Sequence, residues 1–168
     1  MIYAFTGMPL AGKSTYSRSL ALRMKLPRMS TGDFARSLGM GIEPSISRLD
    51  LSKELNAQIN AKVMDFVGSS CGDCVIDGFP RSEEQFHLLE AWGYPFKVFF
   101  MTANPLVIFD RLRKRSEEER RPEDVVSVVM GRVRRSVEWR MQLKQLAGGA
   151  FVDILEGEGA MEFLERSI

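Results

Sequence analysis

The sequence is poor in several features that often decide function. It has one histidine, two cysteines, and no run of apolar residues that approaches the length of about 18 typical of a membrane-spanning helix. Its 23 Lys and Arg residues balance 22 Asp and Glu residues, so no net charge draws it to nucleic acid or to an anionic membrane. The first apolar stretch is too short for a signal peptide and has no basic leader. We therefore expect a cytoplasmic protein that binds neither nucleic acid nor membrane.

The two cysteines form a single Cys-x-x-Cys motif, Cys71-Gly72-Asp73-Cys74. Such a pair can be a redox centre or half of a zinc site, but there is no second pair, and His87 is the one additional candidate ligand. The favoured interpretation is a turn before a buried strand, with Cys74 packed as a small apolar residue.

The distribution of apolar residues predicts one α/β domain. The 168 residues, 45% hydrophobic and 27% charged, suit a single globular domain with a full-sized core. Apolar runs typical of buried strands lie at residues 2–6, 74–79, 97–101 and 150–155, with a weaker one at 26–29. Helical spacing is found at residues 14–24, 52–67, 82–91, 105–114, 122–146 and 160–166. Alternating strands and helices predict a parallel sheet covered on both faces.

The most informative motif is Gly-Met-Pro-Leu-Ala-Gly-Lys-Ser at residues 7–14, which matches the phosphate-loop pattern. It lies between a predicted strand and a predicted helix, as such a loop must. Glycines let successive N–H groups point at phosphate oxygens, and the helix N-terminus adds partial positive charge. Lys13 would reach the β and γ phosphates, and the Ser14 hydroxyl would ligate Mg²⁺. The alternative is a glycine-rich turn with an exposed lysine.

Further polar residues suit a bound nucleotide. Asp77 ends a predicted strand, so its carboxylate can face Mg²⁺ directly or through water; the alternative is a turn-forming Asp-Gly pair. Arg81 follows, and its planar guanidinium can hold a phosphate through two hydrogen bonds. An arginine series occupies positions 111, 115, 121 and 132, for which a basic solvated helix is the alternative. Because ligands of open parallel sheets bind outside the carboxyl ends of the strands, these groups should meet.

Together these segments resemble the adenylate kinases over nearly the whole chain. The resemblance is carried by the phosphate loop, Ser-Thr-Gly-Asp-Phe-Ala-Arg at residues 30–36, Asp-Gly-Phe-Pro-Arg at 77–81 with Gln85, the arginine series, and Glu-Gly-Glu-Gly at 156–159. It implies a three-layer αβα sandwich of the phosphate-loop NTPase type with a five-stranded parallel sheet. It also implies one kinase domain over residues 1–168, with a short AMP-binding insertion at about 31–66 and, as in short-lid members, a lid at about 113–124. The stretches 39–47 and 113–124 are the expected closing covers.

The resemblance assigns a role to each matching residue. The implied ATP-binding residues are Gly7, Pro9, Leu10, Ala11, Gly12, Lys13, Ser14, Thr15, Arg111 and Gly159. The implied AMP-binding residues are Thr31, Gly32, Arg36, Gly78, Arg81, Gln85, Arg121 and Arg132. The implied catalytic residues are Lys13, Arg81, Arg115, Arg121 and Arg132, and the implied Mg²⁺ site consists of Ser14 and Asp77. A monomer that uses ATP, AMP and ADP with Mg²⁺ is expected.

The expected reaction is reversible phosphoryl transfer from MgATP to AMP. Relatives that phosphorylate UMP and CMP tend to carry Ala at the position of Thr31 and Asn near Gln85, so both residues favour AMP. Leu10 stands where adenylate kinases usually have glycine, Ser14 also replaces a usual glycine, and the segment between Arg36 and Asp77 is several residues shorter than usual. The alternatives are a kinase for CMP, UMP or a non-nucleotide acceptor, and a nucleotide-binding module with weak or no turnover.

Overall fold

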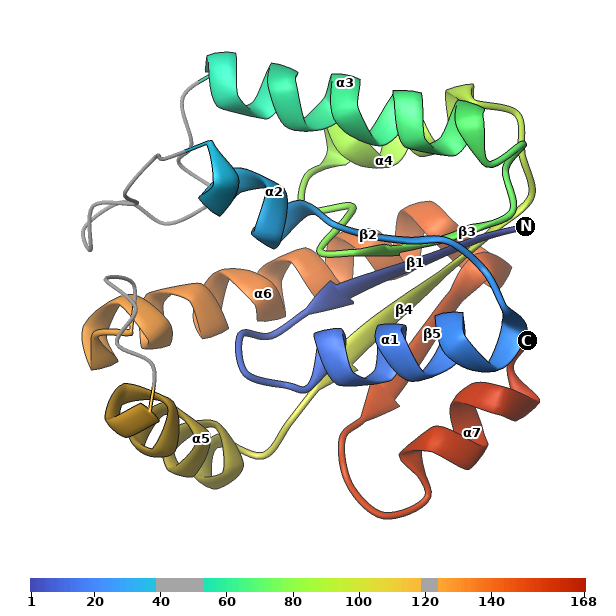
Figure 1. Cartoon of the computed structure of the whole chain (residues 1–168). Coiled ribbons are helices and arrows are strands. Elements are labelled where there is room, and N and C mark those ends of the chain that lie inside the picture. The colour runs from blue at the N-terminus through green and yellow to red at the C-terminus, as the bar shows by residue number, and fades with distance from the viewer. Residues whose placement is uncertain (39–52, 119–123) are drawn as a thin grey trace.

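A computed structural model describes residues 1–38, 53–118 and 124–168 (Figure 1). In this part of the chain, five parallel strands form one sheet in the order β2-β3-β1-β4-β5. The strands are β1 (Ile2–Gly7), β2 (Arg28–Ser30), β3 (Cys74–Asp77), β4 (Phe96–Thr102) and β5 (Phe151–Leu155). The predicted five-stranded parallel sheet is confirmed.

Helices cover both faces of the sheet, which confirms the predicted αβα sandwich (Figure 1). One face packs against α1 (Lys13–Met24), α5 (Pro105–Glu118) and α7 (Ala160–Arg166). The other packs against α2 (Thr31–Ser37), α3 (Lys53–Ser69), α4 (Glu83–Ala91) and most of α6 (Val126–Ala147). No helix in the described ranges is long and apolar enough to cross a membrane.

The central strand β1 divides the interior into two apolar clusters. Ile2 and Ala4 belong to the cluster beneath α3, α4 and α6, whereas Tyr3 and Phe5 belong to the cluster beneath α1, α5 and α7. Successive side chains of a strand point to opposite faces, so a strand covered on both faces must be apolar at every position. This explains why residues 2–5 of β1 and 74–76 of β3 are continuous apolar runs rather than alternating patterns.

Helix α2 was not among the predicted helices. Its seven residues are too few for a repeating apolar face, so the spacing of apolar residues does not predict it. It begins at a cap instead: the Ser30 hydroxyl accepts a hydrogen bond from the Asp33 N–H at 3.2 Å. The predicted strand at 150–155 begins one residue later, at Phe151, after a turn of 3₁₀ helix at Gly148–Ala150.

Several expectations fall partly or wholly on residues outside the described ranges. The proposed cover at residues 39–47 lies wholly outside them, as does Arg121. The proposed insertion at about 31–66, the lid at about 113–124 and the predicted helix at 122–146 each include residues outside them.

Helix α6 is held to the sheet by a buried anchor near its C-terminal end. Leu143 is fully buried, and the Trp139 indole N–H donates to the Pro80 carbonyl at 3.2 Å. The same helix carries Arg132 two turns before Trp139. Packing at its C-terminal half therefore determines where its N-terminal half places a cation.

We expect Leu143→Ala to lower the free energy of unfolding by about 2–5 kcal/mol, because the substitution leaves a cavity in the core. Met141→Ala is the matched control on the same helix, since Met141 is 60% exposed, and should change it by less than about 0.5 kcal/mol. Urea unfolding followed by circular dichroism measures both. Equal losses in the two variants would contradict the packing described for α6.

Candidate active site

The phosphate loop joins β1 to α1 at the carboxyl end of the central strand. Gly7 has φ +123°, and a Cβ there would lie 2.2 Å from the Met101 carbonyl oxygen, so only glycine fits. The next residue, Met8, donates its N–H to the same carbonyl at 2.9 Å. The start of the loop is therefore held against β4.

Leu10 adopts a backbone conformation that favours glycine. Its φ is +61°, a region that costs an ordinary residue about 1 kcal/mol. Two contacts hold it there: its side chain packs against the apolar cluster beneath α1, and its carbonyl accepts a hydrogen bond from Arg111 Nη1 at 2.9 Å. The irregularity noted in the sequence is thus a strained residue supported from α5.

Lys13 is the first residue of α1 and lies across the loop. Its ammonium donates to the carbonyl oxygens of Gly7, at 3.1 Å, and Met8. The loop carbonyls therefore hold the lysine beside the helix N-terminus, where a phosphate would also be attracted.

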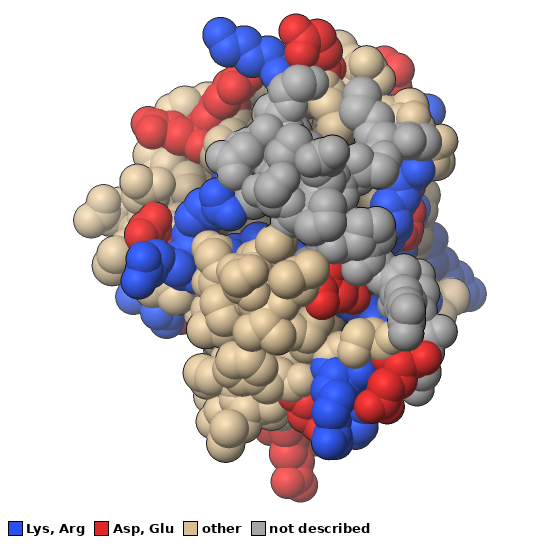
Figure 2. Space-filling view, turned by 90° about the vertical axis from the view of Figure 1, so that its left-hand side faces the viewer, with Lys and Arg blue, Asp and Glu red and all other residues tan. Residues whose placement is uncertain are grey.

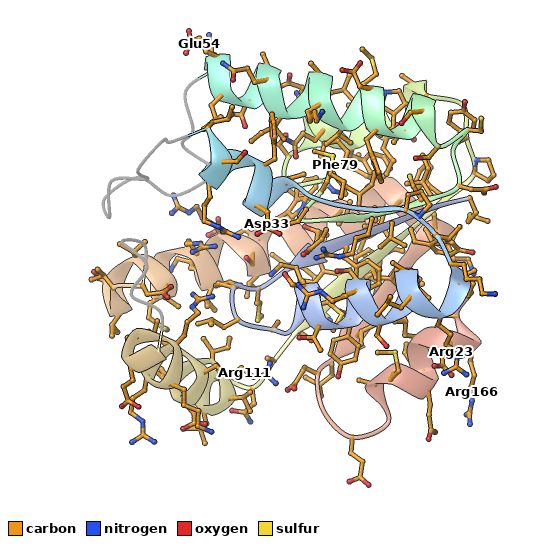
Figure 3. The ribbon with its side chains drawn as sticks, viewed as in Figure 1. Arg23, Asp33, Glu54, Phe79, Arg111 and Arg166 are labelled. Carbon is orange, nitrogen blue, oxygen red and sulfur yellow. The ribbon has the colours of Figure 1, made fainter. Side chains whose placement is uncertain are left out.

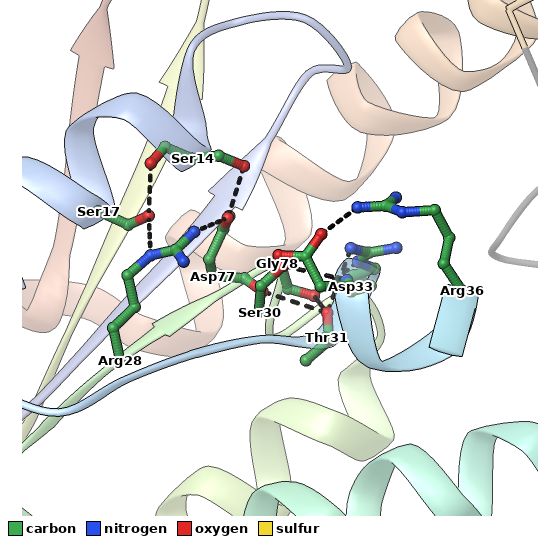
Figure 4. Close-up of polar contacts among 10 residues, drawn as sticks. Ser14, Ser17, Arg28, Ser30, Thr31, Asp33, Arg36, Asp77 and Gly78 are labelled. Carbon is green, nitrogen blue, oxygen red and sulfur yellow. Dashed lines mark hydrogen bonds and ion pairs between the residues drawn. The ribbon is translucent and has the colours of Figure 1, made fainter. Parts of the chain in front are cut away.

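Ser14 and Asp77, the two proposed metal ligands, are in direct contact (Figure 4). The Ser14 hydroxyl donates to Asp77 Oδ2 at 2.6 Å, and Asp77 is 3% exposed at the end of β3. A hydroxyl and a carboxylate are hard oxygen donors that suit Mg²⁺. No group of three or more His, Cys, Asp and Glu side chains suited to a metal is found among the described residues. The donor set therefore fits a cation that takes its other ligands from phosphate and water.

The cysteines are not part of this site. Cys74 is fully buried in the sheet, where burial raises the pKa of its thiol to about 11, and Cys71 is exposed. A thiol with so high a pKa is a poor nucleophile and metal ligand. His87 is exposed on α4 beside Glu83 and Glu90. Cys74 thus packs as a small apolar residue, as expected.

A second group of residues surrounds the turn after β3. Gly78 has φ +90°, and a Cβ there would lie 2.3 Å from Arg81 Nη2. The freed space admits the arginine, whose Nε donates to the Gly78 carbonyl at 2.6 Å. Thr31 is buried and donates its hydroxyl hydrogen to that carbonyl at 2.9 Å, while its oxygen accepts from Arg81 Nη2 at 3.3 Å. The Phe79–Pro80 peptide bond in this turn is cis.

Gln85 is buried beside this turn, and both ends of its amide are engaged. Its Oε1 accepts from the Arg81 backbone N–H at 2.8 Å, and its Nε2 donates to Asn60 Oδ1 at 3.1 Å. Asn60 comes from α3 and was not predicted as a site residue, since nothing in its sequence neighbourhood marks it. The contact joins α3 to the start of α4.

Carboxylates hold several of the predicted cations. Arg36 pairs with Asp33, Arg115 donates Nε to Asp124 Oδ2 at 2.6 Å, and Arg111 pairs with Glu156. Burial raises the pKa of Asp33, but the Ser30 hydroxyl and the Arg36 guanidinium outweigh it and hold the pKa below its ordinary value. These acidic partners orient the arginines.

The loops enclose a cleft of about 360 Å³ at the carboxyl end of the sheet. Its lining residues are Pro9, Leu10, Gly12, Lys13, Ser14, Thr15, Ser30, Gly32, Arg36, Asp77, Arg81, Arg111, Arg115 and Arg132. Six of them are cations and one is a carboxylate. Figure 2 views the molecule from this end and shows Lys and Arg side chains to the left and to the lower right of the tan area at its centre. Such a cleft suits a ligand with several negative charges.

The structure brings most of the predicted site residues together. Every lining residue except Ser30 was predicted as a site residue. The predicted residues among the described ones that do not line the cleft are Gly7, Ala11, Thr31, Gly78, Gln85 and Gly159. Of these, Thr31 and Gln85 are buried, and the hydrogen bonds described above join both of them to Arg81.

Sequence reasoning missed Arg28. Its guanidinium donates to Asp77 Oδ2 at 2.6 Å (Figure 4). The available signal was weak, because it consists of one basic residue inside the weak strand predicted at residues 26–29.

Comparisons with known proteins agree with this geometry. The family model described as "AAA domain" matches residues 6–129. The adenylate kinase of Caulobacter vibrioides is 27% identical over 177 aligned positions, which cover 96% of this chain and 92% of that protein. The adenylate kinase of Rhodopirellula baltica is 31% identical over 144 positions, covering 80% of this chain and 74% of that protein. The adenylate kinase of Chlamydia pneumoniae is 33% identical over 101 positions, covering 54% and 46%. The chain therefore belongs to the AAA domain family over residues 6–129 and, by its similarity to the Rhodopirellula protein, to the adenylate kinase family.

Proposed function

We propose that this protein is an adenylate kinase that transfers the γ-phosphoryl group of MgATP reversibly to AMP, giving two ADP. The observation that carries the proposal is the six-cation cleft between the phosphate loop and the turn after β3. Two nucleotides that meet end to end through their phosphates bring the concentrated negative charge that this cleft suits. The relatives named adenylate kinase support the same reaction.

The donor half consists of the phosphate loop and its neighbours. Backbone N–H groups at the start of α1 and the Lys13 ammonium would bind the ATP phosphates. Arg111, held between the Leu10 carbonyl and Glu156, would lie against the ATP base. Ser14 and Asp77 would hold Mg²⁺, which when bound neutralises charge on the β and γ phosphates.

The acceptor half consists of the residues around the turn after β3. Arg36 and Arg81 would bind the AMP phosphate, and both line the cleft. Thr31 and Gln85 would lie beside the adenine, as in the adenylate kinases that this chain resembles. Arg36 would exchange Asp33 for the phosphate, because a dianion attracts a guanidinium more strongly than a single carboxylate does.

Catalysis would consist of positioning and charge neutralisation. Phosphoryl transfer requires little covalent chemistry from the protein, and the phosphate of AMP is already an anion, so no general base is needed. Lys13, Arg115, Arg121 and Arg132 would surround the transferring group. Covers at residues 39–47 and 113–124 would exclude water as a competing acceptor. One chain provides all these groups, so we propose a monomer.

A kinase for another acceptor is the second candidate, because the segment between Arg36 and Asp77 is shorter than is usual in adenylate kinases. An assay of ADP formation from ATP with AMP, CMP, UMP and no acceptor separates the candidates. We expect kcat/KM for AMP to exceed the values for CMP and UMP at least about tenfold, a selectivity that one hydrogen-bonded base contact can supply. If no ADP is formed from ATP and AMP, the proposal is refuted.

The Lys13→Ala variant should lose most of the turnover but keep the melting temperature of the wild type.

We expect Arg81→Ala to raise the KM for AMP at least about tenfold and to leave the KM for ATP nearly unchanged. Removing a hydrogen bond to a charged group costs about 1.5–3 kcal/mol, which corresponds to such a change. The matched control is Arg113→Ala on α5, because Arg113 is 72% exposed and lies outside the cleft lining. Steady-state kinetics with each nucleotide varied in turn measures both constants. An unchanged KM for AMP in Arg81→Ala would remove Arg81 from the acceptor site.

We expect Glu156→Gln to raise the KM for ATP roughly three- to tenfold, because Arg111 loses its ionic partner and its fixed position. Glu158→Gln changes the same charge two residues away on an exposed side chain and should have no such effect. Equal KM values for ATP in both variants would show that Glu156 does not orient the donor site. The KM for AMP serves as the internal reference.

A further inference from the structure

The carboxylate proposed to hold the metal already has a cationic partner. Arg28 is the first residue of β2, and its side chain is only 15% exposed. Its Nη2 donates to Asp77 Oδ2 at 2.6 Å, and its Nε donates to the Ser17 hydroxyl at 2.9 Å (Figure 4). A guanidinium stays protonated at every physiological pH, so this positive charge is permanent.

These contacts close a ring of hydrogen bonds. The Ser17 hydroxyl donates to the Ser14 carbonyl at 3.3 Å, and the Ser14 hydroxyl donates to Asp77 Oδ2 at 2.6 Å. The ring joins α1, β2 and β3 through Arg28. Among the described residues, the side chains of Ser14 and Arg28 donate hydrogen bonds to the Asp77 carboxylate, and Oδ2 accepts both. Oδ1 is therefore the oxygen left for a metal or for its water.

The charge balance of this site disfavours a cation that arrives alone. The cleft lining contains six cations and the single carboxylate of Asp77, and Arg28 already neutralises that carboxylate from behind. A divalent cation without nucleotide would be attracted by a carboxylate whose charge Arg28 already offsets, and it would be repelled by Arg28 itself. The triphosphate of the donor would reverse this balance, because it brings several negative charges with it.

We propose that Arg28 is a positioning residue with a second effect on metal binding. It fixes Asp77 with Oδ1 available, and it weakens binding of a free divalent cation at Ser14 and Asp77, so that the cation binds together with the nucleotide phosphates. This inference rests on the metal site of the proposed function, and extends it to a residue that does not line the cleft.

The test is titration of the full-length, nucleotide-free protein with Mn²⁺, with free Mn²⁺ measured by its electron paramagnetic resonance signal. We expect the wild type to bind Mn²⁺ weakly and Arg28→Gln to bind it at least about tenfold more tightly, because glutamine carries no charge and its amide nitrogen ends where Arg28 Nε lies, beside Ser17 rather than Asp77. Adding Asp77→Asn to Arg28→Gln should abolish the gain, which places the bound ion at this carboxylate. Unchanged Mn²⁺ affinity in Arg28→Gln, or a gain that survives Asp77→Asn, would overturn the proposal.

Arg23→Gln is the matched control. It removes the same charge from an exposed arginine at the far end of the molecule from Arg111 (Figure 3), and Mn²⁺ affinity should not change. An equal gain in Arg23→Gln would mean that overall charge, and not Arg28, controls the affinity, and would also overturn the proposal.

Arg28→Lys separates charge from position and remains informative if the glutamine variant does not fold. Lysine keeps the charge but cannot bridge Ser17 and Asp77 with a planar fork. Free Mn²⁺ should therefore still bind weakly, while the Mg²⁺ concentration needed to activate the enzyme at fixed ATP should rise at least about threefold. No change in that concentration would refute the positioning role. The Mn²⁺ titration contains neither ATP nor AMP, so its outcome does not depend on whether AMP is the acceptor.

Discussion

The concentration of positive charge at the carboxyl end of the sheet is the constraint on which the rest of the site depends. Six cations line a cleft of about 360 Å³, and like charges brought together in so small a space repel one another. The fold gives several of them an internal partner: loop carbonyls for Lys13, Asp33 for Arg36, Glu156 for Arg111, and Asp124 for Arg115. The cleft is thereby arranged before a ligand arrives. Binding of phosphates would exchange these partners rather than assemble the site anew.

Tight backbone packing places these groups within reach of one another. Gly7 lies against the Met101 carbonyl, and Gly78 leaves room for the Arg81 guanidinium, so both positions exclude a side chain for steric reasons. Leu10 is the exception, because it adopts a glycine-like conformation without being glycine. Its strain is compensated by the apolar cluster on one side and by Arg111 on the other. The geometry of the phosphate loop is thus linked to α5 and, through Glu156, to the loop after β5.

The Asp77 carboxylate illustrates how the surrounding charges set the chemistry of one group. Ser14 and Arg28 both donate to its Oδ2, so it is oriented and partly neutralised before any cation binds. A carboxylate in that state favours a cation that arrives with its own anions. The same arrangement joins β2, β3 and α1, so the geometry of the proposed metal site and the packing of the sheet edge support each other.

The sequence by itself determined the local parts of this protein. The phosphate loop, its flanking strand and helix, the five apolar strand segments and the position of Asp77 at a strand end could all be predicted, because each depends on neighbouring residues. The short helix α2 could not, since a cap at Ser30 rather than periodicity begins it. Only the tertiary structure decided the strand order and the pairs Arg28–Asp77, Gln85–Asn60 and Arg111–Leu10, which are separated by 49, 25 and 101 residues. Such contacts arise from the way the sheet packs its elements together, and no pattern of adjacent residues encodes them.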